Sequence, residues 1–281
     1  MDSSAYPVPS DSQGLAGRQR ARGEVRAEFA AANGGAALAR LYQTGGLRLA
    51  TPHADGGAEA VLINTGGGMA GGDEARLDFS LGPNAQVMLT TQSAEKIYRG
   101  DGETARVRAD IRLAAAARLE WLPQETILFE GARLARRLEI DMAEDAALLL
   151  VEAFTFGRTA FGEDRIDASL RDSWRVRRAG KLIFAEQLRL DHSAALLARP
   201  AIGGGARAMA SLLIIAADPP ASLAALRAAF DPHGPAVEWG ASLVEGTVVA
   251  RALSPSPSHL RAAIVGVLAA LRGRAAPRVW L

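Results

Sequence analysis

The sequence predicts a mainly β protein: a single elongated domain of layered, mostly antiparallel sheets with a few helices. Three observations support this fold class. Apolar and polar residues alternate in many short segments, as strands with one buried face require. Turn signals separate these segments at intervals of about 8 to 12 residues. Helical periodicity occurs in only two places, which disfavours an architecture of alternating strands and helices.

The alternating segments begin with "EVRAEF" at residues 24–29, where apolar side chains occupy every second position. The segment "ARLDFSL" at 75–81 repeats the pattern, and the turn signal "GPN" follows it directly. The predicted strands are residues 24–29, 58–64, 75–81, 85–91, 105–114, 117–123, 125–131, 136–142, 147–157, 167–178, 181–190 and 246–253.

Two segments instead show the spacing of helices. Residues 218–230 begin with an Asp cap followed by proline, which fits the first turn of a helix. Residues 256–274 form the clearer helix, near the C-terminus. Its apolar stripe consists of Leu260, Ile264, Val267, Leu268 and Leu271.

Composition excludes several classes of protein. The net charge of +1 provides no overall positive field to attract nucleic acid. The absence of cysteine excludes disulfides and thiolate metal sites and fits a reducing compartment. Because no apolar run is long enough to span a membrane, we expect a cytoplasmic protein. Residues 1–21 are expected to be a disordered tail, and residues 22–281 one β-rich domain without an internal sequence repeat.

The glycine-rich stretch "INTGGGMAGGDE" at residues 63–74 contains the spacing G-x-G-x-x-G, starting from Gly66. That spacing binds a dinucleotide when a helix follows it, because the helix N-terminus holds the pyrophosphate. Here the alternating segment 75–81 follows, so the spacing favours a tight connection between strands. A nucleotide-binding oxidoreductase that uses this turn remains the alternative hypothesis.

The residues after the glycines resemble the signature of the urease accessory protein D family, also called H. Its first stretch runs from the glycines to "EKIYRG", and the matching residues are Gly67, Gly68, Gly71, Gly72, Asp73, Thr90, Thr91, Lys96, Tyr98 and Arg99. Similar stretches follow in order: "LEWLPQETILFEGA" with Glu125, "FGRTAFGE" with Arg158, Gly162 and Glu163, and the closing "PRVW". Residues 1–20 and about 50–60 lie outside this resemblance.

The resemblance implies a mostly β scaffold that acts in the cytoplasm. It would join accessory protein F and the GTPase accessory protein G to the urease apoprotein, so that nickel is inserted in a GTP-dependent step. Neither nucleic acid nor a membrane is implied as a partner. A member of the same family that serves another metalloenzyme is a third hypothesis.

The side chains argue against catalysis. None of the four histidines, His53, His192, His233 and His259, lies in a recognisable catalytic motif, so we expect that the chain is not an enzyme.

No tightly bound cofactor is expected either. Nickel could pass along loosely binding carboxylates, and Asp73, Glu125 and Glu130 are the proposed transient path. Asp78, Glu120 and Glu163 are further candidates, although solvation or ion pairing is the simpler interpretation of each carboxylate.

Other motif residues have structural interpretations. Lys96 could pair with Glu95 or with a carboxylate across the sheet, or meet a partner. Arg158 and Glu163 are expected to form an internal ion pair or to brace a loop. Thr90 and Thr91 fit strand propensity. The tryptophans Trp121, Trp174 and Trp280 are expected to be buried.

Overall fold

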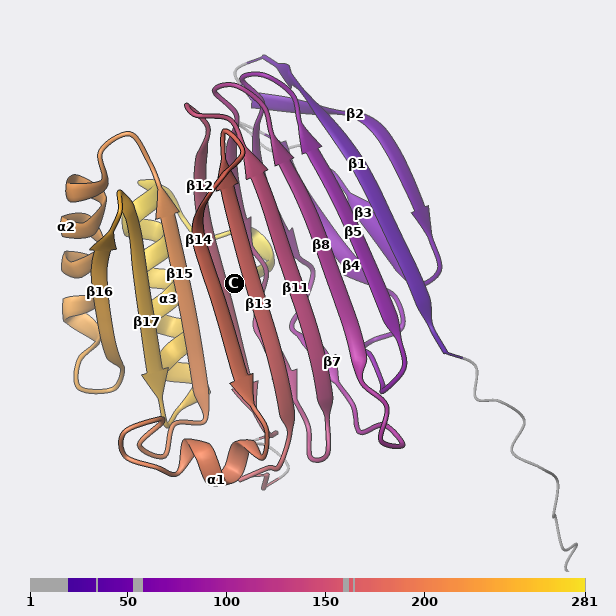
Figure 1. Ribbon diagram of the computed structural model, residues 1–281, viewed down its shortest axis with the longest axis vertical. Coiled ribbons are helices and arrows are strands. Elements are labelled where there is room, and N and C mark those ends of the chain that lie inside the picture. The colour runs from indigo at the N-terminus through magenta and orange to yellow at the C-terminus, as the bar shows by residue number, and fades with distance from the viewer. Residues whose placement is uncertain (1–19, 34, 53–57, 159–161, 164, 281) are drawn as a thin grey trace, which may run out of the picture.

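Two stacked β-sheets and a layer of helices make up the computed structural model of the protein (Figure 1). It describes residues 20–33, 35–52, 58–158, 162–163 and 165–280. Most of the predicted N-terminal tail, residues 1–19, therefore lies outside the described residues. The prediction of a mainly β, layered fold with few helices is confirmed.

The first sheet, called the front sheet below, has seven strands within the described residues, in the order β14-β13-β11-β8-β5-β1-β2. Its strands are β1 (Arg22–Ala32), β2 (Gly35–Thr44), β5 (Glu74–Leu81), β8 (Ala105–Leu113), β11 (Arg133–Met142), β13 (Ser169–Arg178) and β14 (Lys181–Leu190).

The second sheet, called the rear sheet, follows the order β16-β17-β15-β12-β9-β6-β4-β3, with β7 and β10 attached beside β12. Its strands are β3 (Leu47–Ala50), β4 (Ala58–Asn64), β6 (Gln86–Thr91), β7 (Glu95–Ile97), β9 (Arg118–Leu122), β10 (Thr126–Leu128), β12 (Ala147–Phe156), β15 (Ala208–Ile215), β16 (Glu238–Val244) and β17 (Thr247–Ser254). The helices are α1 (Ser193–Leu197), α2 (Pro219–Phe230) and α3 (Pro257–Arg272), with short 3-10 turns η2 (Asp231–His233) and η3 (Arg278–Trp280).

The prediction of mostly antiparallel sheets is wrong for the centre of both sheets. In the front sheet β1, β5, β8, β11 and β13 pair in parallel, and in the rear sheet β4, β6, β9 and β12 do the same. Antiparallel pairs lie toward the ends, as between β13 and β14 or β12 and β15. Between β4 and β13 the chain repeatedly crosses from one sheet to the other, so this part winds as a coil and its neighbouring strands within a sheet run the same way.

The turns of this coil stack on one another as the strands do. The amide of Ala114 donates to the carbonyl of Leu81, and the amide of Ala143 donates to the carbonyl of Leu113, each at 2.9 Å. A short turn after an alternating strand is equally compatible with a hairpin and with a crossing to the other sheet. The local sequence therefore does not distinguish the two arrangements.

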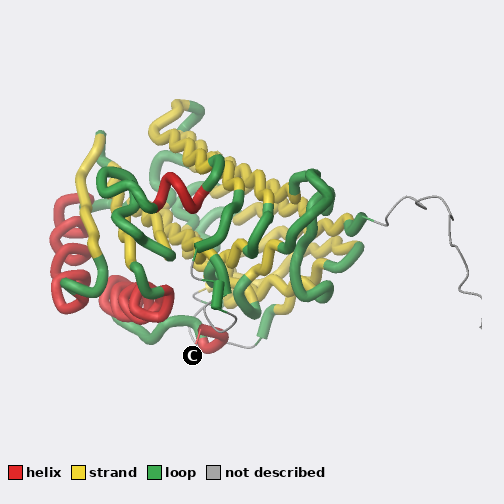
Figure 2. Tube along the Cα trace, turned by 90° about the horizontal axis from the view of Figure 1, so that it is seen from below, coloured by secondary structure: helices red, strands yellow, loops and turns green. Residues whose placement is uncertain are grey.

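Two hydrophobic cores hold the layers together. Between the sheets, Phe79 of β5 meets Trp121 of β9 edge-on, with ring centroids 6.1 Å apart. A second core lies between the rear sheet and α2 and α3, which gather on the side of β16 and β17 (Figure 2). The predicted stripe of the C-terminal helix faces this core. None of the helices in the described part of the chain has the length and apolar character needed to cross a membrane.

Three of the strands that the sequence pattern missed, β2, β15 and β16, have a weak alternation signal, whereas the short β3 alternates between buried and exposed residues. Every residue of β15 is buried, because the front-facing side contacts the core between the sheets and the other side contacts the helices. In contrast, β2 and β16 are edge strands whose residues are mostly exposed. Period-two alternation needs one buried and one exposed face, and none of these three strands has that contrast.

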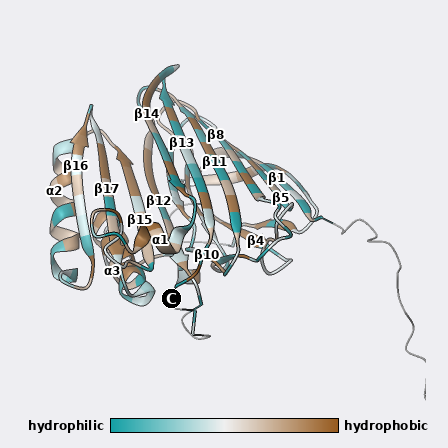
Figure 3. Ribbon diagram, turned by 60° about the horizontal axis from the view of Figure 1, so that its bottom comes forward, coloured by the Kyte–Doolittle hydropathy of each residue, from teal (hydrophilic) through white to brown (hydrophobic). Residues whose placement is uncertain are grey.

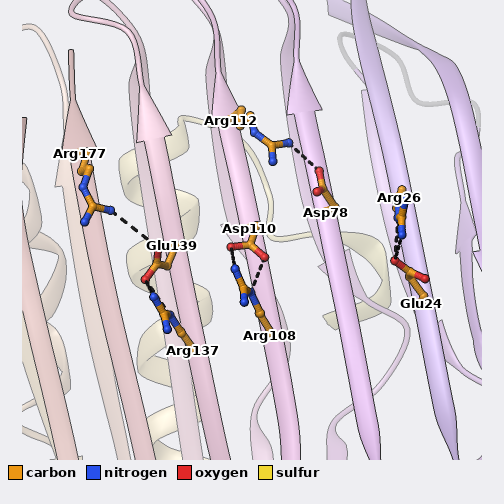
Figure 4. Close-up of polar contacts among 9 residues, drawn as sticks. All are labelled: Glu24, Arg26, Asp78, Arg108, Asp110, Arg112, Arg137, Glu139 and Arg177. Carbon is orange, nitrogen blue, oxygen red and sulfur yellow. Dashed lines mark hydrogen bonds and ion pairs between the residues drawn. The ribbon is translucent and has the colours of Figure 1, made fainter. Parts of the chain in front are cut away.

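The outer face of the front sheet carries rows of like charge. The parallel register places Arg76, Arg108 and Arg137 side by side on β5, β8 and β11. The next outward row consists of Asp78, Asp110 and Glu139. Like charges in neighbouring strands repel, and pairs along the strands, such as Arg108 with Asp110 at 2.7 Å, offset this repulsion (Figure 4). The alternating hydropathy of these strands is visible in Figure 3.

The parallel coil can be tested by cross-linking, because the natural chain has no cysteine. Arg76→Cys and Arg108→Cys would stand on neighbouring strands in register, about 4.8 Å apart across the sheet. A short thiol-reactive cross-linker should join them, as mass spectrometry of the linked peptides would show. The pair Arg76→Cys and Arg175→Cys, separated by β8 and β11, should not react. Failure of the first pair to link, with both thiols accessible, would contradict the parallel pairing.

Candidate functional site

The glycine-rich stretch joins β4 of the rear sheet to β5 of the front sheet. Its Met69 pairs with β7, since the Met69 amide donates to the Lys96 carbonyl at 2.8 Å and the Tyr98 amide donates to the Met69 carbonyl at 2.7 Å. Gly68 has φ +149°, and a Cβ there would lie 2.7 Å from the Lys96 carbonyl oxygen and overlap the Tyr98 ring. The strand β5 begins directly afterwards. The glycines therefore allow a close crossing of backbones, and no helix N-terminus follows them.

Asp73 fixes the end of this stretch. Its carboxylate is buried and accepts hydrogen bonds from the amides of Ala21 and Ala70, at 2.8 and 2.7 Å. These bonds tie the glycine-rich segment to the residue just before β1. Gly71 and Gly72 lie between the two anchoring points; a Cβ on Gly71 would lie 2.9 Å from the Cα of Gly100. Both oxygens of Asp73 thus have a structural role.

Side chains from three separate motifs stack beside the glycines. The rings of Tyr98 and Phe129 meet edge-on, with centroids 5.0 Å apart. The guanidinium of Arg158 lies over the Phe129 ring, 4.4 Å from its centroid. The Tyr98 hydroxyl donates to the Gly67 carbonyl at 3.3 Å. We call this set the glycine-loop cluster; it comprises Gly67, Gly68, Lys96, Tyr98, Arg99, Phe129, Arg158 and Glu163.

The predicted ion pair between Arg158 and Glu163 is confirmed. Arg158 donates to Glu163 through its side chain and through its backbone amide. These hydrogen bonds lower the pKa of Glu163. Gly162 lies in the turn before Glu163 with φ +73°. The pair braces a loop and holds the guanidinium on Phe129.

Lys96 and Arg99 differ from the rest of the cluster. Both side chains are exposed, and in the part of the chain that the structure describes neither forms an ion pair. Glu95, one of the possible partners of Lys96, accepts instead from the side-chain amide nitrogen of Asn64, which lies 3.1 Å from each carboxylate oxygen and also donates to the Gly68 carbonyl. Burial raises the pKa of Glu95. The aliphatic part of Arg99 lies against Gly131.

A second group of motif residues fixes the C-terminal segment onto the rear sheet. Thr90 is fully buried and accepts the indole N–H of Trp280 at 3.0 Å. Gln124 donates to the carbonyls of Thr91 and Val279. We call this group the C-terminal clamp; its residues are Thr90, Thr91, Gln124, Glu125, Arg261, Val279 and Trp280.

Arg261 of α3 holds the clamp together. It donates to the Gln124 side chain and to the Trp280 carbonyl, at 2.9 and 2.8 Å, and it pairs with Glu125. Thr90 and Thr91 are therefore more than strand formers, because their hydroxyls accept bonds that position distant segments. The strand propensity of threonine gave no sign of these contacts.

A buried charge network crosses the space between the sheets. Arg136 of β11 donates to Asp172 of β13 through two nitrogens, at 2.9 and 3.0 Å, and to Glu152 of β12 in the rear sheet. Trp121 donates to Glu152 at 2.8 Å, and Trp174 donates to Asp172 at 2.9 Å. Burial raises the pKa of Glu152, while the attraction of Arg136 opposes that rise. All five side chains are almost completely buried.

A small cavity adjoins this network. Its volume is about 80 Å³, and Glu95, Thr126, Trp121, Arg136 and Glu152 are among the residues that line it. It lies between the sheets and reaches from beneath β7 toward the network. Two carboxylate residues and one arginine are therefore among the residues that line an interior space near the glycine-loop cluster.

Comparison with known proteins decides the family. A family model described as "UreD urease accessory protein" matches residues 21–281. The chain belongs to this family of urease accessory proteins. A urease accessory protein UreD from Methylobacterium sp. (strain 4-46) is 47% identical over 283 residues, which cover 99% of each chain. The corresponding protein of Beijerinckia indica is 44% identical over 263 residues, 93% of this chain and 97% of that protein.

The family match includes residues about 50–60, which the motif comparison had left outside. The motifs that suggested the UreD family at the sequence level lie in two places in the fold. The glycines, "EKIYRG" and "FGRTAFGE" meet in the glycine-loop cluster, whereas Thr90, Thr91, Glu125 and "PRVW" meet in the C-terminal clamp. In this urease accessory protein, the family motifs thus join segments that are distant in the sequence.

The carboxylates proposed for nickel are spread over the fold, and each has a protein partner. Asp78 pairs with Arg112, Glu120 with Arg272 and Arg274, and Glu130 accepts from the amide of Asp167. Within the described residues, no group of three or more His, Cys, Asp or Glu side chains could hold a metal ion. The structure does not bring Asp73, Glu125 and Glu130 together as one site.

Sequence analysis missed Glu95, Arg136, Glu152 and Asp172. One signal was available: Glu152 interrupts the apolar run "ALLLVEAFTF", and a carboxylate at that position must have a buried partner. The identity of the partner depends on the coil, which places β11, β12 and β13 around the same interior point.

The buried charge network gives a prediction with a defined pH dependence. Arg136→Met should lower the free energy of unfolding by about 3 to 5 kcal/mol at neutral pH, because Glu152 and Asp172 would become buried unpaired charges. Without the attraction of Arg136, the pKa of Glu152 in the folded chain would rise further above its value in the unfolded chain. The folded variant would then bind the proton more tightly, so its stability should increase as the pH falls through that raised pKa.

Urea denaturation at neutral and mildly acidic pH would measure this effect. Arg175→Met, at an exposed position of β13, is the matched control and should change stability by less than about 0.5 kcal/mol. A loss of stability in Arg136→Met that stays the same at both pH values would show that the carboxylates are not the source of the instability.

Proposed function

We propose that the chain is a cytoplasmic scaffold of urease maturation. It would join accessory protein F and the GTPase G to the urease apoprotein, so that GTP-dependent nickel insertion takes place on the assembled complex. The observation that carries this proposal is the family match over residues 21–281, together with relatives called urease accessory protein UreD along nearly their full length.

The geometry of the polar groups supports a role in binding rather than catalysis. Among the described histidines, His192 pairs with Asp167 on the surface, His259 lies in the first turn of α3, and His233 lies beside Gly266. None of these contacts joins a histidine to a serine or threonine nucleophile. The oxidoreductase alternative lacks support, because β5 occupies the place where a dinucleotide fold has a helix.

Nickel would be cargo for such a scaffold. Carboxylate oxygens hold this ion more loosely than thiolate or imidazole, as transit requires. The small cavity between the sheets is lined in part by the carboxylate residues Glu95 and Glu152. We therefore add these two residues to the earlier set of Asp73, Glu125 and Glu130 as proposed points of contact for nickel in transit.

The scaffold function can be tested by omission. Urease structural subunits are produced with all accessory proteins in nickel-containing medium, with and without this chain. We expect urease activity and bound nickel to fall strongly when the chain is left out, because no other component would link the GTPase to the apoprotein. Equal urease activity with and without the chain would contradict the proposal.

The route of nickel can be tested by isosteric variants. Glu95→Gln keeps the shape of the side chain and removes a carboxylate that lines the cavity, so the nickel content of urease should fall severalfold while the accessory complex still forms. Glu152→Gln also weakens the buried pair with Arg136, so its effect on nickel delivery counts only where urea denaturation shows that the variant is folded. Asp110→Asn, on the outer face of the front sheet, is the matched control. The triple variant Asp73→Ala, Glu125→Ala and Glu130→Ala tests the other set. If nickel delivery is normal in all these variants, the carboxylates do not carry the ion.

A further inference from the structure

A hollow on the outer face of the front sheet is lined by arginines. Its volume is about 350 Å³, and it lies over the first halves of β5, β8, β11 and β13. Figure 4 shows the arginines of β8 and β11 on this face. We call this feature the arginine hollow. The exposed arginines that line it are Arg76, Arg106, Arg108, Arg137 and Arg171.

The parallel register of the strands produces the hollow. Ala135 of β11 lies in register between Arg106 of β8 and Arg171 of β13. In the next outward row, Ser173 of β13 lies beside Arg137 of β11. The short side chains of Ala135 and Ser173 leave a depression, because the neighbouring outward positions carry long arginine side chains.

The arginine hollow has an excess of positive charge. Glu74 and Asp172 are the acidic residues of its lining. The Asp172 side chain is buried and is paired with Arg136, so it does not compensate the exposed arginines. Glu74 lies 3.5 Å from Arg76. Five exposed arginines therefore share one exposed carboxylate within the lining, and a concave surface with charge of one sign attracts ions of the opposite sign.

The guanidinium groups keep donors for a ligand. In the part of the chain that the structure describes, the Arg106 side chain forms no hydrogen bond or ion pair. The pair of Arg171 with Asp191 is long, at 3.7 Å. Arg108 donates to Asp110 through Nε and Nη2, which leaves Nη1 without a partner among the described residues. Because a guanidinium has five N–H groups, a paired arginine such as Arg108 can still bind an anion.

We propose that the arginine hollow binds a compact anion that carries a diphosphate group. The forked donors of arginine match phosphate oxygens in bidentate contacts. Arg106 and Arg108 belong to two rows of arginines that lie about 6.8 Å apart along the strands. Two linked phosphate groups can contact both rows at once, whereas a single phosphate would contact one. This binding site goes beyond the scaffold function and is separate from the interior carboxylates proposed for nickel.

The surroundings of the arginine hollow favour a compact anion over an acidic protein segment. The next outward row along the strands carries the carboxylates of Asp78, Asp110 and Glu139. On the side of β1, Glu24 lies in register with Arg76. An extended acidic segment would reach these carboxylates and be repelled by them. A diphosphate group is short enough to stay within the hollow.

The test measures binding of pyrophosphate to the full chain by isothermal titration calorimetry. We expect saturable binding that weakens as salt is added, because the contacts are ionic and exposed. The double variant Arg106→Ser with Arg171→Ser should raise the dissociation constant by about tenfold or more, since it removes charge-assisted hydrogen bonds from one row. Both side chains are exposed, so the variant should fold, and urea denaturation checks this. The single variant Arg106→Ser, which breaks no ion pair within the described chain, should weaken binding in the same direction.

The front sheet offers a matched control. Arg175 is exposed on the same face of β13 and lies outside the lining of the hollow. Arg175→Ser therefore removes the same charge from the face and should leave pyrophosphate binding within about twofold of the wild type. Equal weakening by Arg175→Ser and by the double variant would show that the face attracts anions without a defined site, and the inference would be wrong.

Three further ligands identify the occupant. ADP tests whether the diphosphate belongs to a nucleotide: tighter binding of ADP than of pyrophosphate assigns a nucleotide, and tighter binding of pyrophosphate assigns the inorganic anion. Sulfate and a short glutamate peptide carry no diphosphate. The inference is rejected if either binds as tightly as pyrophosphate, or if the wild-type chain binds neither pyrophosphate nor ADP. The chain is titrated alone, so these outcomes leave the scaffold function untouched.

Discussion

The repeated passage of the chain from one sheet to the other between β4 and β13 is the constraint on which the rest of the structure depends. Because β5, β8, β11 and β13 reach the front sheet in the same direction, residues far apart in sequence occupy neighbouring strands in register. The stacked turns repeat this spacing through hydrogen bonds such as Ala114 to Leu81. The charge rows on the front face, the interior network and the meeting of the motifs all follow from this winding.

The buried charge network shows what the winding makes possible and what it costs. A lone carboxylate such as Glu152 in a core would strongly destabilise the fold. The coil places Arg136 within reach of both Glu152 and Asp172, and the two tryptophans donate to the same two carboxylates. An arginine shared between two sheets also restricts their relative sliding, since a shift of one residue would break bonds to both partners. The network thus fixes register as well as compensating charge.

The sequence predicts features that depend on residues close together in the chain better than features that depend on distant residues. Alternation identifies β5 and β13 and the inward position of Trp174, because each of these strands has one buried face and one solvent-exposed face. Alternation fails to identify β15, because both faces of this strand are buried. It also cannot tell a hairpin from a crossing between sheets, so the antiparallel prediction is wrong. The ion pair of Arg158 with Glu163 was predictable from proximity in sequence, whereas Thr90 with Trp280 depends on the whole fold.

Whether the polar side chains form hydrogen bonds within the fold or are free to contact another molecule indicates what kind of function the fold can serve. Catalytic sites hold a nucleophile or base whose reactive atom is free to meet the substrate, usually in a water-poor cavity. Here the interior carboxylate Glu152 and the motif residues Asp73, Thr90 and Glu163 accept bonds that maintain the fold. Because the buried polar groups of the chain are used for architecture, the contacts support the proposal of a binding role rather than a catalytic one.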